Sequence, residues 1–390
     1  MNILIATDTY YPSVNGAAYF TYRLATGLAG RGHRISVICP SENTHNTIQE
    51  KGGVTVYGIR SLPILVYTGF RVSLPMVSRR EIREIVSNVH PDTIHVQSHF
   101  TTCKEVLIAG KSLGIPVIGT NHFMPENLIH YLHPPHALQG HLSRLAWKQC
   151  VHTFQRLDAI TTPTKTAADA MVAAGFTKKI IPISCGIDLE RFRPRTANEM
   201  MRKRYGIPLG VPVLLYVGRL DKEKQIEVAL QGLAAVRHHM DVHLCIVGDG
   251  KEHKHLTALA GSLGLDSAVT FTGRISDASM EYIHSIADLF VMPSIAELQS
   301  IATMEAMACG LPVVAANAMA LPELVHNGKN GYVFPAGDSE AFASRVQSIL
   351  ADTALRKQMG EESLSIISSH SIQNTLTSFE ELYAAHRRTS

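Results

Sequence analysis

The feature that most restricts the fold of this chain is a repeated alternation of short apolar runs with helical patterns. Strands that are buried on both faces of a parallel sheet consist of continuous runs of apolar residues. The helices between these runs connect each strand to the next parallel strand. The alternation therefore predicts an α/β chain with two series of parallel strands, that is, two Rossmann-like domains. The expected strands are Ile3–Thr7, Arg34–Cys39, Val54–Ile59, Thr93–Val96, Pro116–Thr120 and Ala159–Pro163, then Val211–Val217, Val242–Val247, Val269–Thr272, Leu289–Met292, Val313–Ala315 and Gly331–Phe334.

A boundary between the two series is expected between Ile187 and Gly210. Arginine and proline residues interrupt the pattern there, and a chain of 390 residues is long for a single domain. We therefore predict a first domain over 1–187 and a second over 188–369.

The composition excludes several classes of protein. Hydrophobic residues make up 45% of the chain and charged residues 18%, so a sizeable core is expected and disorder is not. The net charge of +3 is too small to indicate nucleic-acid binding. The six cysteines are scattered without zinc spacing, as expected of reduced core thiols. No signal peptide and no membrane-spanning run is apparent, which predicts a cytoplasmic protein.

Two carboxylates flank the start of an expected helix that Gly310 and Pro312 end. Glu297 would lie in the loop before this helix and Glu305 on it. Carboxylates there can accept hydrogen bonds from vicinal hydroxyls, and a helix N-terminus favours a phosphate. A ligand with both hydroxyls and a phosphate is typical of a nucleotide sugar, so the pattern indicates a site for such a ligand. The alternative is that the two glutamates are only charged side chains exposed to solvent on the helix.

Two loops that follow expected strands could bind phosphate. In the first, Gly16 would let the backbone approach a ligand, but the loop lacks the GxGxxG pattern of NAD enzymes and could be only a turn. In the second, Arg219 could make forked contacts to a diphosphate and Lys224 could add a charge. The alternative for the second loop is a charged surface turn.

Taken together, these motifs resemble the family-4 retaining glycosyltransferases of the GT-B fold. The resemblance covers nearly the whole chain and includes Gly218-Arg219-Leu220, Lys224, Glu297 and Glu305, with Gly186-Ile187-Asp188, Gly248-Asp249-Gly250 and Phe271-Thr272-Gly273. It implies that two Rossmann-like domains face an interdomain cleft. The first would bind the acceptor, the second would bind a nucleotide sugar, and a helix over about 370–390 would return to the first domain.

The resemblance also implies roles for individual residues. Arg219 and Lys224 would bind the donor diphosphate, Glu305 the ribose and Glu297 the donor sugar. Backbone near Arg274 and Ile275 would contact the base, and Gly16 would lie beside the phosphates. Gly218, Gln299, Ser300 and Ile301 complete the expected donor site. No cofactor is expected, and no divalent metal, because no Asp-x-Asp motif follows a strand.

A narrower resemblance concerns the acceptor. The segment from His122 to Tyr131, and Gln299 after the first glutamate, are similar to bacterial diacylglycerol glucosyltransferases. The resemblance assigns His122 to the donor sugar near the reacting centre, whereas most of the 20 histidines must be structural or exposed. Glu126, His130 and Tyr131 are acceptor candidates. Ser300 and Cys185 depart from the family pattern, which commonly has Gly and Asn or Thr there.

An apolar stretch before three arginines could contact a membrane. Residues 61–76 contain apolar side chains that precede Arg79, Arg80 and Arg83, a pattern that can bind an anionic bilayer. The alternative is a loop folded onto the core with solvated arginines. We expect hexose transfer from UDP-glucose to a lipid such as diacylglycerol at the inner face of the cell membrane. The alternatives are a soluble acceptor (an aminocyclitol, a sugar phosphate or a polysaccharide) and a non-catalytic nucleotide-sugar-binding protein.

Overall fold

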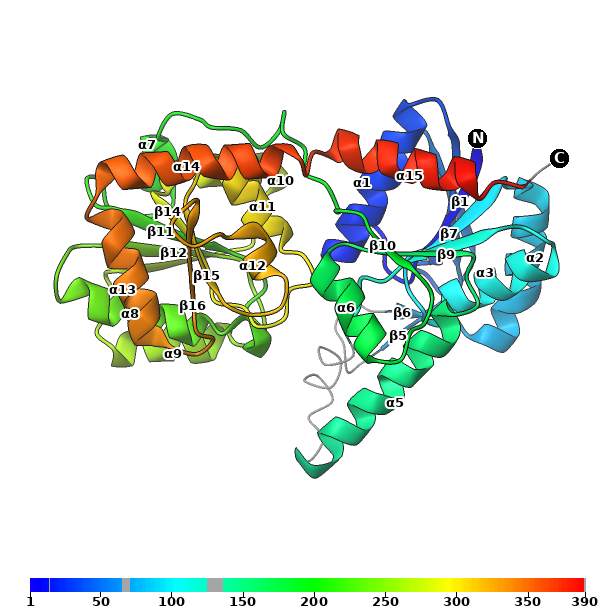
Figure 1. The fold of residues 1–390 in the computed structure, drawn as a ribbon, viewed down its shortest axis with the longest axis horizontal. Coiled ribbons are helices and arrows are strands. Elements are labelled where there is room, and N and C mark those ends of the chain that lie inside the picture. The colour runs from blue at the N-terminus through cyan, green and yellow to red at the C-terminus, as the bar shows by residue number, and fades with distance from the viewer. Residues whose placement is uncertain (14, 65–70, 125–135, 389–390) are drawn as a thin grey trace. The chain divides into compact units, whose positions relative to one another are not determined.

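The computed structural model describes residues 1–13, 15–64, 71–124 and 136–388. The chain divides into two compact units (Figure 1). The first comprises Met1–Cys185 with Gln373–Ser390, and the second comprises Gly186–Ile372. The division after Cys185 lies two residues before the boundary expected from sequence, at 187.

The first unit is built on an eight-stranded sheet in the order β10-β9-β8-β7-β1-β2-β4-β3. All neighbouring strands are parallel except β3, which pairs antiparallel with β4 at the edge. A separate two-stranded sheet joins β5 to β6. The strands are β1 (Asn2–Ala6), β2 (Arg34–Pro40), β3 (Thr47–Lys51), β4 (Val54–Ile59), β5 (Leu62–Pro63), β6 (Arg71–Val72), β7 (Thr93–Val96), β8 (Val117–Thr120), β9 (Ala159–Thr162) and β10 (Ile180–Pro182).

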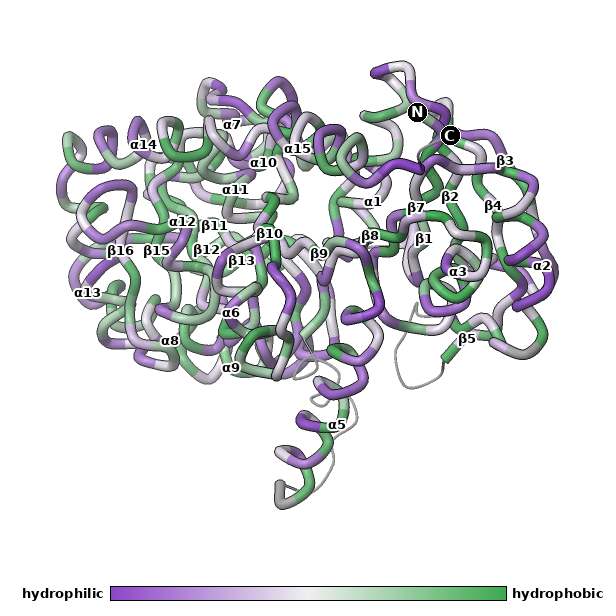
Figure 2. The backbone as a smooth tube through the Cα atoms, turned by 45° about the vertical axis from the view of Figure 1, so that its right-hand side comes forward, coloured by the Kyte–Doolittle hydropathy of each residue, from purple (hydrophilic) through white to green (hydrophobic). Residues whose placement is uncertain are grey.

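Helices cover this sheet and connect its parallel strands. Because parallel strands need crossovers, the helices follow the strands along the chain. They are α1 (Gly16–Gly30), α2 (Pro75–Val89), α3 (Thr101–Ser112), α5 (His136–Phe154), α6 (Lys165–Ala173) and, from the end of the chain, α15 (Ile372–Ala385). In Figure 1, α5 extends away from the sheet, and in Figure 2 hydrophobic and hydrophilic residues alternate along it.

The helix α15 packs on α1 in the first unit. Leu376 lies so close to Gly27 that a Cβ at position 27 would come within 2.8 Å of it. Glu380 pairs with Arg31 at 2.5 Å and with His33 at 2.8 Å. Apolar contact and ion pairing therefore both hold the end of the chain on the first unit.

The second unit has a six-stranded, wholly parallel sheet in the order β13-β12-β11-β14-β15-β16. Its strands are β11 (Val213–Val217), β12 (His243–Val247), β13 (Val269–Gly273), β14 (Leu289–Met292), β15 (Val313–Ala316) and β16 (Gly331–Phe334). The helices are α7 (Glu199–Arg204), α8 (Ile226–Arg237), α9 (His253–Ser262), α10 (Asp277–Ile283), α11 (Ile301–Ala308), α12 (Leu321–Leu324), α13 (Ser339–Leu350) and α14 (Thr353–Ser368), with the short 3₁₀ turns η1 (Lys222–Lys224) and η2 (His284–Ile286).

Both units are Rossmann-like, as predicted. Every strand expected from the apolar runs is present, with ends that differ by no more than two residues. The order of each sheet reverses once, between β1 and β7 in the first unit and between β11 and β14 in the second. Ligands of such sheets bind at this switch point, beyond the carboxyl ends of the strands.

Candidate active site

The loops after β11 and β12 contact each other backbone to backbone. Gly218 donates its N–H to the carbonyl of Val247 at 3.0 Å. Gly248 has φ +135°, and a Cβ there would lie 1.8 Å from the carbonyl oxygen of Gly218. Only glycine fits at position 248, so the Gly248-Asp249-Gly250 motif holds the loop that carries Arg219 against its neighbour.

Lys224 and Glu297 form an ion pair at the switch point of the second unit. Lys224 ends η1 after β11, and Glu297 lies in the loop after β14. Their side chains meet at 2.6 Å (Nζ to Oε1), and each is 13% exposed. The two loops are also joined by the N–H of Ile295, which donates to the carbonyl of Glu223 at 3.0 Å. A cation and a carboxylate are thus held side by side where a ligand is expected.

Arg219 has two acidic partners that sequence reasoning did not identify. Its guanidinium pairs with Asp221 and, at 3.0 Å, with Glu223. Both carboxylates are buried, whereas about a third of the arginine side chain is exposed. The spacing of two and four residues was the available signal, because side chains four apart in a turn can meet. The carboxylates orient the plane of the guanidinium. Their negative charges also offset part of its positive charge.

Ser300 is the N-cap of α11. Its Oγ accepts hydrogen bonds from the backbone N–H of Thr303 at 3.3 Å and from the hydroxyl of Thr303 at 2.8 Å. The departure from glycine therefore has a structural role, since a serine in this position satisfies a donor of the first helical turn. Gln299 is buried beside it, Ile301 begins the helix, and Glu305 lies one turn later, partly exposed.

Arg274 and Ile275 follow β13 at the same edge of the sheet. Gly273 ends the strand with φ +66°, and its carbonyl accepts the N–H of Gly248 at 3.0 Å. Arg274 is exposed and Ile275 is partly buried. The structure therefore brings the residues expected for the base to the edge that carries Arg219 and Lys224.

In the first unit, Gly16 is the first residue of α1, and Asn15 caps this helix. The side chain of Asn15 accepts the N–H of Ala18 at 2.9 Å. Asp8, in the same loop, accepts the N–H of Thr102 at 2.8 Å and a hydrogen bond from the hydroxyl of Ser98. These contacts join the loop after β1 to the start of α3.

His122 lies just beyond β8 and has a partner that sequence reasoning missed. Its Nε2 lies 3.0 Å from Oε1 of Gln97, which follows β7, and its ring centroid is 4.7 Å from that of Phe20. Burial lowers the pKa of His122 to about 3, so the imidazole is neutral at pH 7. The acceptor candidates Glu126, His130 and Tyr131 lie outside the described residues.

Metal ligation and membrane crossing find no support in the described part of the chain. No group of three or more His, Cys, Asp or Glu side chains there could hold a metal ion. No helix in those ranges is long and apolar enough to cross a bilayer. The six cysteines are free thiols; burial raises the pKa of Cys150, Cys185 and Cys309 to about 12.

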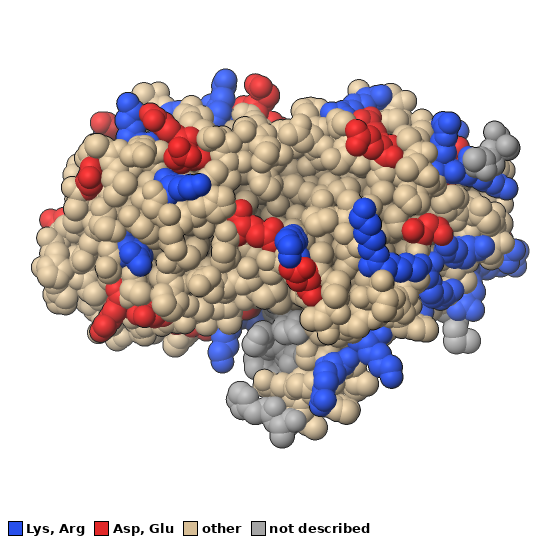
Figure 3. Space-filling view, viewed as in Figure 1, with Lys and Arg blue, Asp and Glu red and all other residues tan. Residues whose placement is uncertain are grey.

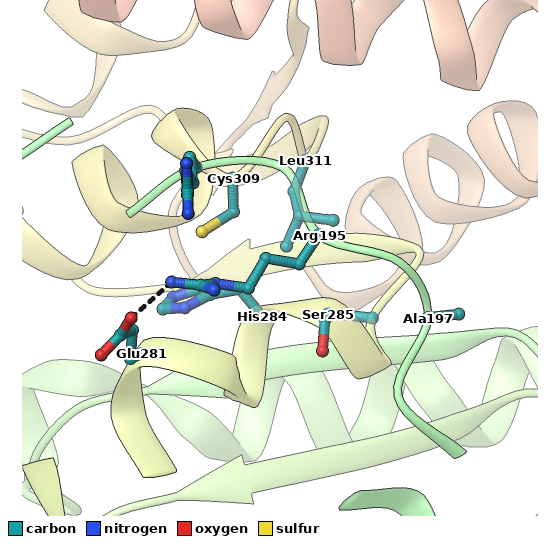
Figure 4. Close-up of a pocket in the computed structure, with 9 residues that line it drawn as sticks. Arg195, Ala197, Glu281, His284, Ser285, Cys309 and Leu311 are labelled. Atoms are coloured by element: carbon teal, nitrogen blue, oxygen red, sulfur yellow. Dashed lines mark hydrogen bonds and ion pairs between the residues drawn. The ribbon is translucent and has the colours of Figure 1, made fainter. Parts of the chain in front are cut away.

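A cavity of about 150 Å³ lies elsewhere in the second unit (Figure 4). In the figure the guanidinium of Arg195 points toward Glu281, with which it pairs at 2.5 Å. The lining residues are Arg193, Arg195, Ala197, Glu281, His284, Ser285, Ala287, Cys309 and Leu311, and none of the residues expected to bind the donor is among them. The pair ties the segment after Ile187 to α10.

Two family models match the chain in succession. Glycosyltransferase Family 4 matches residues 14–191, and Glycosyl transferases group 1 matches 197–365. The chain is a glycosyltransferase of the GT-B fold. The match to the second model spans Arg219, Lys224, Glu297 and Glu305, and the match to the first spans Gly16 and His122.

Known relatives of this glycosyltransferase are similar along most of its length. It is 26% identical to alpha-monoglucosyldiacylglycerol synthase of Streptococcus pneumoniae, over 97% of the chain and 85% of the relative. It is 28% identical to a GDP-mannose-dependent alpha-mannosyltransferase of Mycobacterium tuberculosis, over 87% of the chain and 85% of the relative. The structure of Anabaena HepE with UDP and glucose has the same fold, with a TM-score of 0.79, 20% identity and coverage of 99% and 100% of the two chains.

Proposed function

We propose that this glycosyltransferase transfers a hexose, with retention of configuration, from UDP-glucose to a membrane lipid such as diacylglycerol. The proposal of a nucleotide-sugar donor rests on the ion pair between Lys224 and Glu297. This pair is held at 2.6 Å where the strand order of the second unit reverses. A lysine there suits the diphosphate, and a carboxylate suits the hydroxyls of the sugar.

In the proposed donor site, Arg219 and Lys224 stabilise the diphosphate. Glu305 binds the ribose, Glu297 the sugar, and the backbone at Arg274 and Ile275 the base. Gly218, Gln299, Ser300 and Ile301 shape the site around them. In the first unit, Gly16 approaches the phosphates and His122 the sugar. All of these residues follow strands at their carboxyl ends or lie within the first two turns of the next helix, where such contacts are made.

The proposed chemistry breaks the bond between the anomeric carbon and the diphosphate oxygen. The acceptor hydroxyl oxygen bonds to this carbon on the same face, and its proton passes to the departing phosphate. Positive charge at Arg219 and Lys224 lowers the barrier by stabilising the leaving group. Neutral His122, whose Nε2 faces Gln97, has Nδ1 available for a hydrogen bond with a sugar hydroxyl. This scheme needs no divalent metal or cofactor.

The lipid acceptor is supported by a relative's name and by exposed side chains of the first unit. Leu74 and Val77, at the start of α2, are 48% and 41% exposed, and Leu138 and Leu145 on α5 are 52% and 51% exposed. Lys and Arg side chains gather over the part of this unit that carries α2 and α3, with others along α5 (Figure 3). Exposed apolar and basic side chains of this kind suit the surface of an anionic bilayer.

Two of the three arginines expected from the sequence to contact a membrane, Arg79 and Arg80, form ion pairs within the first unit. Arg79 makes two hydrogen bonds to the buried carboxylate of Glu105, at 2.8 and 3.1 Å, and Arg80 pairs with Glu84 at 2.8 Å. Substitution of Arg79 would therefore disturb packing as well as surface charge. The exposed stripe of α5, with Arg144 and Lys148 beside its leucines, is the cleaner surface to test.

The deciding experiment measures transfer from UDP-glucose to diacylglycerol in vesicles with and without anionic lipid. We expect activity to rise with anionic lipid and to fall with salt, because each basic residue at the surface adds about 1 kcal/mol of attraction. Leu138→Ser with Leu145→Ser should weaken vesicle binding and transfer while donor hydrolysis stays unchanged. The exposed Val172 on α6 serves as the control, as Val172→Ser. Full activity on a water-soluble acceptor, with no response to vesicles, would refute the lipid assignment.

A further inference from the structure

A chain of buried hydrogen bonds connects His122 to the C-terminal helix α15. Oε1 of Gln97 lies 3.0 Å from Nε2 of His122, and Nε2 of Gln97 lies 3.1 Å from Nδ1 of His95. The hydroxyl of Tyr383, on α15, lies 2.7 Å from the same Nδ1. Gln97, His95 and Tyr383 are buried, so water does not compete for these contacts.

The hydrogen bonds on the two sides of His95 determine where its proton lies. Its Nε2 is 2.7 Å from the hydroxyl of Thr120, which is 2.5 Å from the hydroxyl of Thr161. The buried hydroxyl of Tyr383 has Nδ1 of His95 as its acceptor among the described residues, so it donates its proton there. The ring proton then lies on Nε2 and is donated to the hydroxyl of Thr120. His95 therefore carries its proton on Nε2.

This assignment sets the direction of the remaining hydrogen bonds. Burial lowers the pKa of His95 to about 3, so the ring is neutral and its Nδ1 is an acceptor. Nδ1 has a single lone pair, which accepts the hydroxyl of Tyr383 at 2.7 Å. The amide nitrogen of Gln97 lies 3.1 and 3.3 Å from the two ring nitrogens, so the amide N–H rather than the amide oxygen faces the electron-rich ring. The amide oxygen of Gln97 then faces His122 and accepts the proton on its Nε2, which leaves Nδ1 of His122 as the acceptor of that ring.

We propose that Tyr383 and His95 are positioning residues that hold His122 in the tautomer protonated on Nε2. The inference rests on the proposed role of His122 toward the donor sugar. Aromatic packing supports the same geometry: Phe379 of α15 lies 5.9 Å from Phe20 and 5.1 Å from His95, between ring centroids. The last helix of the chain thus determines whether Nδ1 of His122 accepts or donates a hydrogen bond toward a ligand.

The first test compares Tyr383→Phe with Thr375→Val in the full chain. Both substitutions remove one hydroxyl of α15, but the hydroxyl of Thr375 donates to the carbonyl of Ser184, at 2.9 Å, outside the network. We expect Tyr383→Phe to lower kcat about tenfold, the effect of one hydrogen bond, with the KM for the donor unchanged. Nitrogen-15 NMR of labelled histidines should show His122 changing from one tautomer to a mixture. Thr375→Val should leave kcat and the His122 resonances unchanged.

The second test replaces His95. His95→Asn places an oxygen where Nδ1 was and can still accept from Tyr383 and Gln97, whereas His95→Leu cannot. We expect the asparagine variant to keep most of the kcat and the His122 tautomer, and the leucine variant to lose both. Equal loss in two folded variants, or wild-type His122 resonances in Tyr383→Phe, would overturn the inference. Full kcat in His122→Ala would instead refute the proposed role of His122, and the tautomer would then be judged by NMR alone.

Discussion

At the scale of single residues, Lys224 is the side chain on which the donor chemistry most depends. We expect Lys224→Ala to lower kcat about 100- to 1000-fold, because one preorganised charge at the leaving group typically contributes that much. Lys222 lies in the same 3₁₀ turn but is exposed, so Lys222→Ala is a matched control that should keep wild-type activity. Steady-state kinetics on both variants makes the comparison. Equal activity of the two variants would remove Lys224 from the proposed site.

Arg219 contributes to stability as well as to catalysis. Its removal would leave the buried carboxylates of Asp221 and Glu223 without their cation. We expect Arg219→Ala to cost about 1 to 3 kcal/mol of unfolding free energy, below the value for a fully buried pair because the guanidinium is about one-third exposed. Arg219→Lys should restore much of this stability but less of the activity, since lysine lacks the forked geometry. Urea denaturation and kinetics on both variants would separate the two effects.

At the scale of elements, the start of α11 joins helix stability to the donor site. Ser300→Ala should cost about 1 kcal/mol through loss of the N-cap, whereas Ser300→Gly should cost only a few tenths of that. Glycine is also the residue that the family resemblance leads us to expect at this position, so Ser300→Gly should keep its activity. Urea denaturation and the KM for the donor test this expectation. A large rise in KM with Ser300→Gly would mean that the hydroxyl contacts the donor directly.

At the scale of the whole molecule, buried neutral histidines make stability depend on pH. Burial lowers the pKa of His95 to about 3 and the pKa of His99, His243 and His284 to about 4, against about 6.5 in the unfolded chain. Between these values the unfolded state binds more protons, so the stability present above pH 6.5 is lost as the pH falls. Each such histidine steepens the loss by about 1.4 kcal/mol per pH unit.

Urea denaturation at pH 7, 6 and 5 measures this slope directly. His95→Asn removes one titrating ring and should make the slope shallower, with a lower stability at pH 7. The exposed His90, replaced by Asn, is the control and should leave the slope unchanged. A stability that stays level from pH 7 to pH 5 would contradict the prediction.

The order of apolar runs along the chain is enough to predict the two Rossmann-like series and the loops at the carboxyl ends of their strands. An apolar run such as Val213–Val217 shows from its own residues that the strand is buried. A residue directly after such a run must lie at the carboxyl edge of the sheet. This is why the position of Arg219, Lys224 and Glu297 at that edge was predictable. Some short edge elements were missed: β3 has mostly exposed side chains, so burial leaves no apolar run there.

Which side chains meet depends on how elements far apart in the chain pack together. Lys224 and Glu297 are 73 residues apart, and His95 and Tyr383 are 288 apart, so no local pattern could pair them. From the sequence, Arg79 was expected to be a surface charge. In the structure α2 packs on α3, and Glu105 of α3 pairs with it. Local periodicity reports whether a residue is buried, whereas its partner depends on how distant elements pack. For this reason the fold was predictable from the sequence. The hydrogen bonds that connect His122 through Gln97 and His95 to Tyr383 were not.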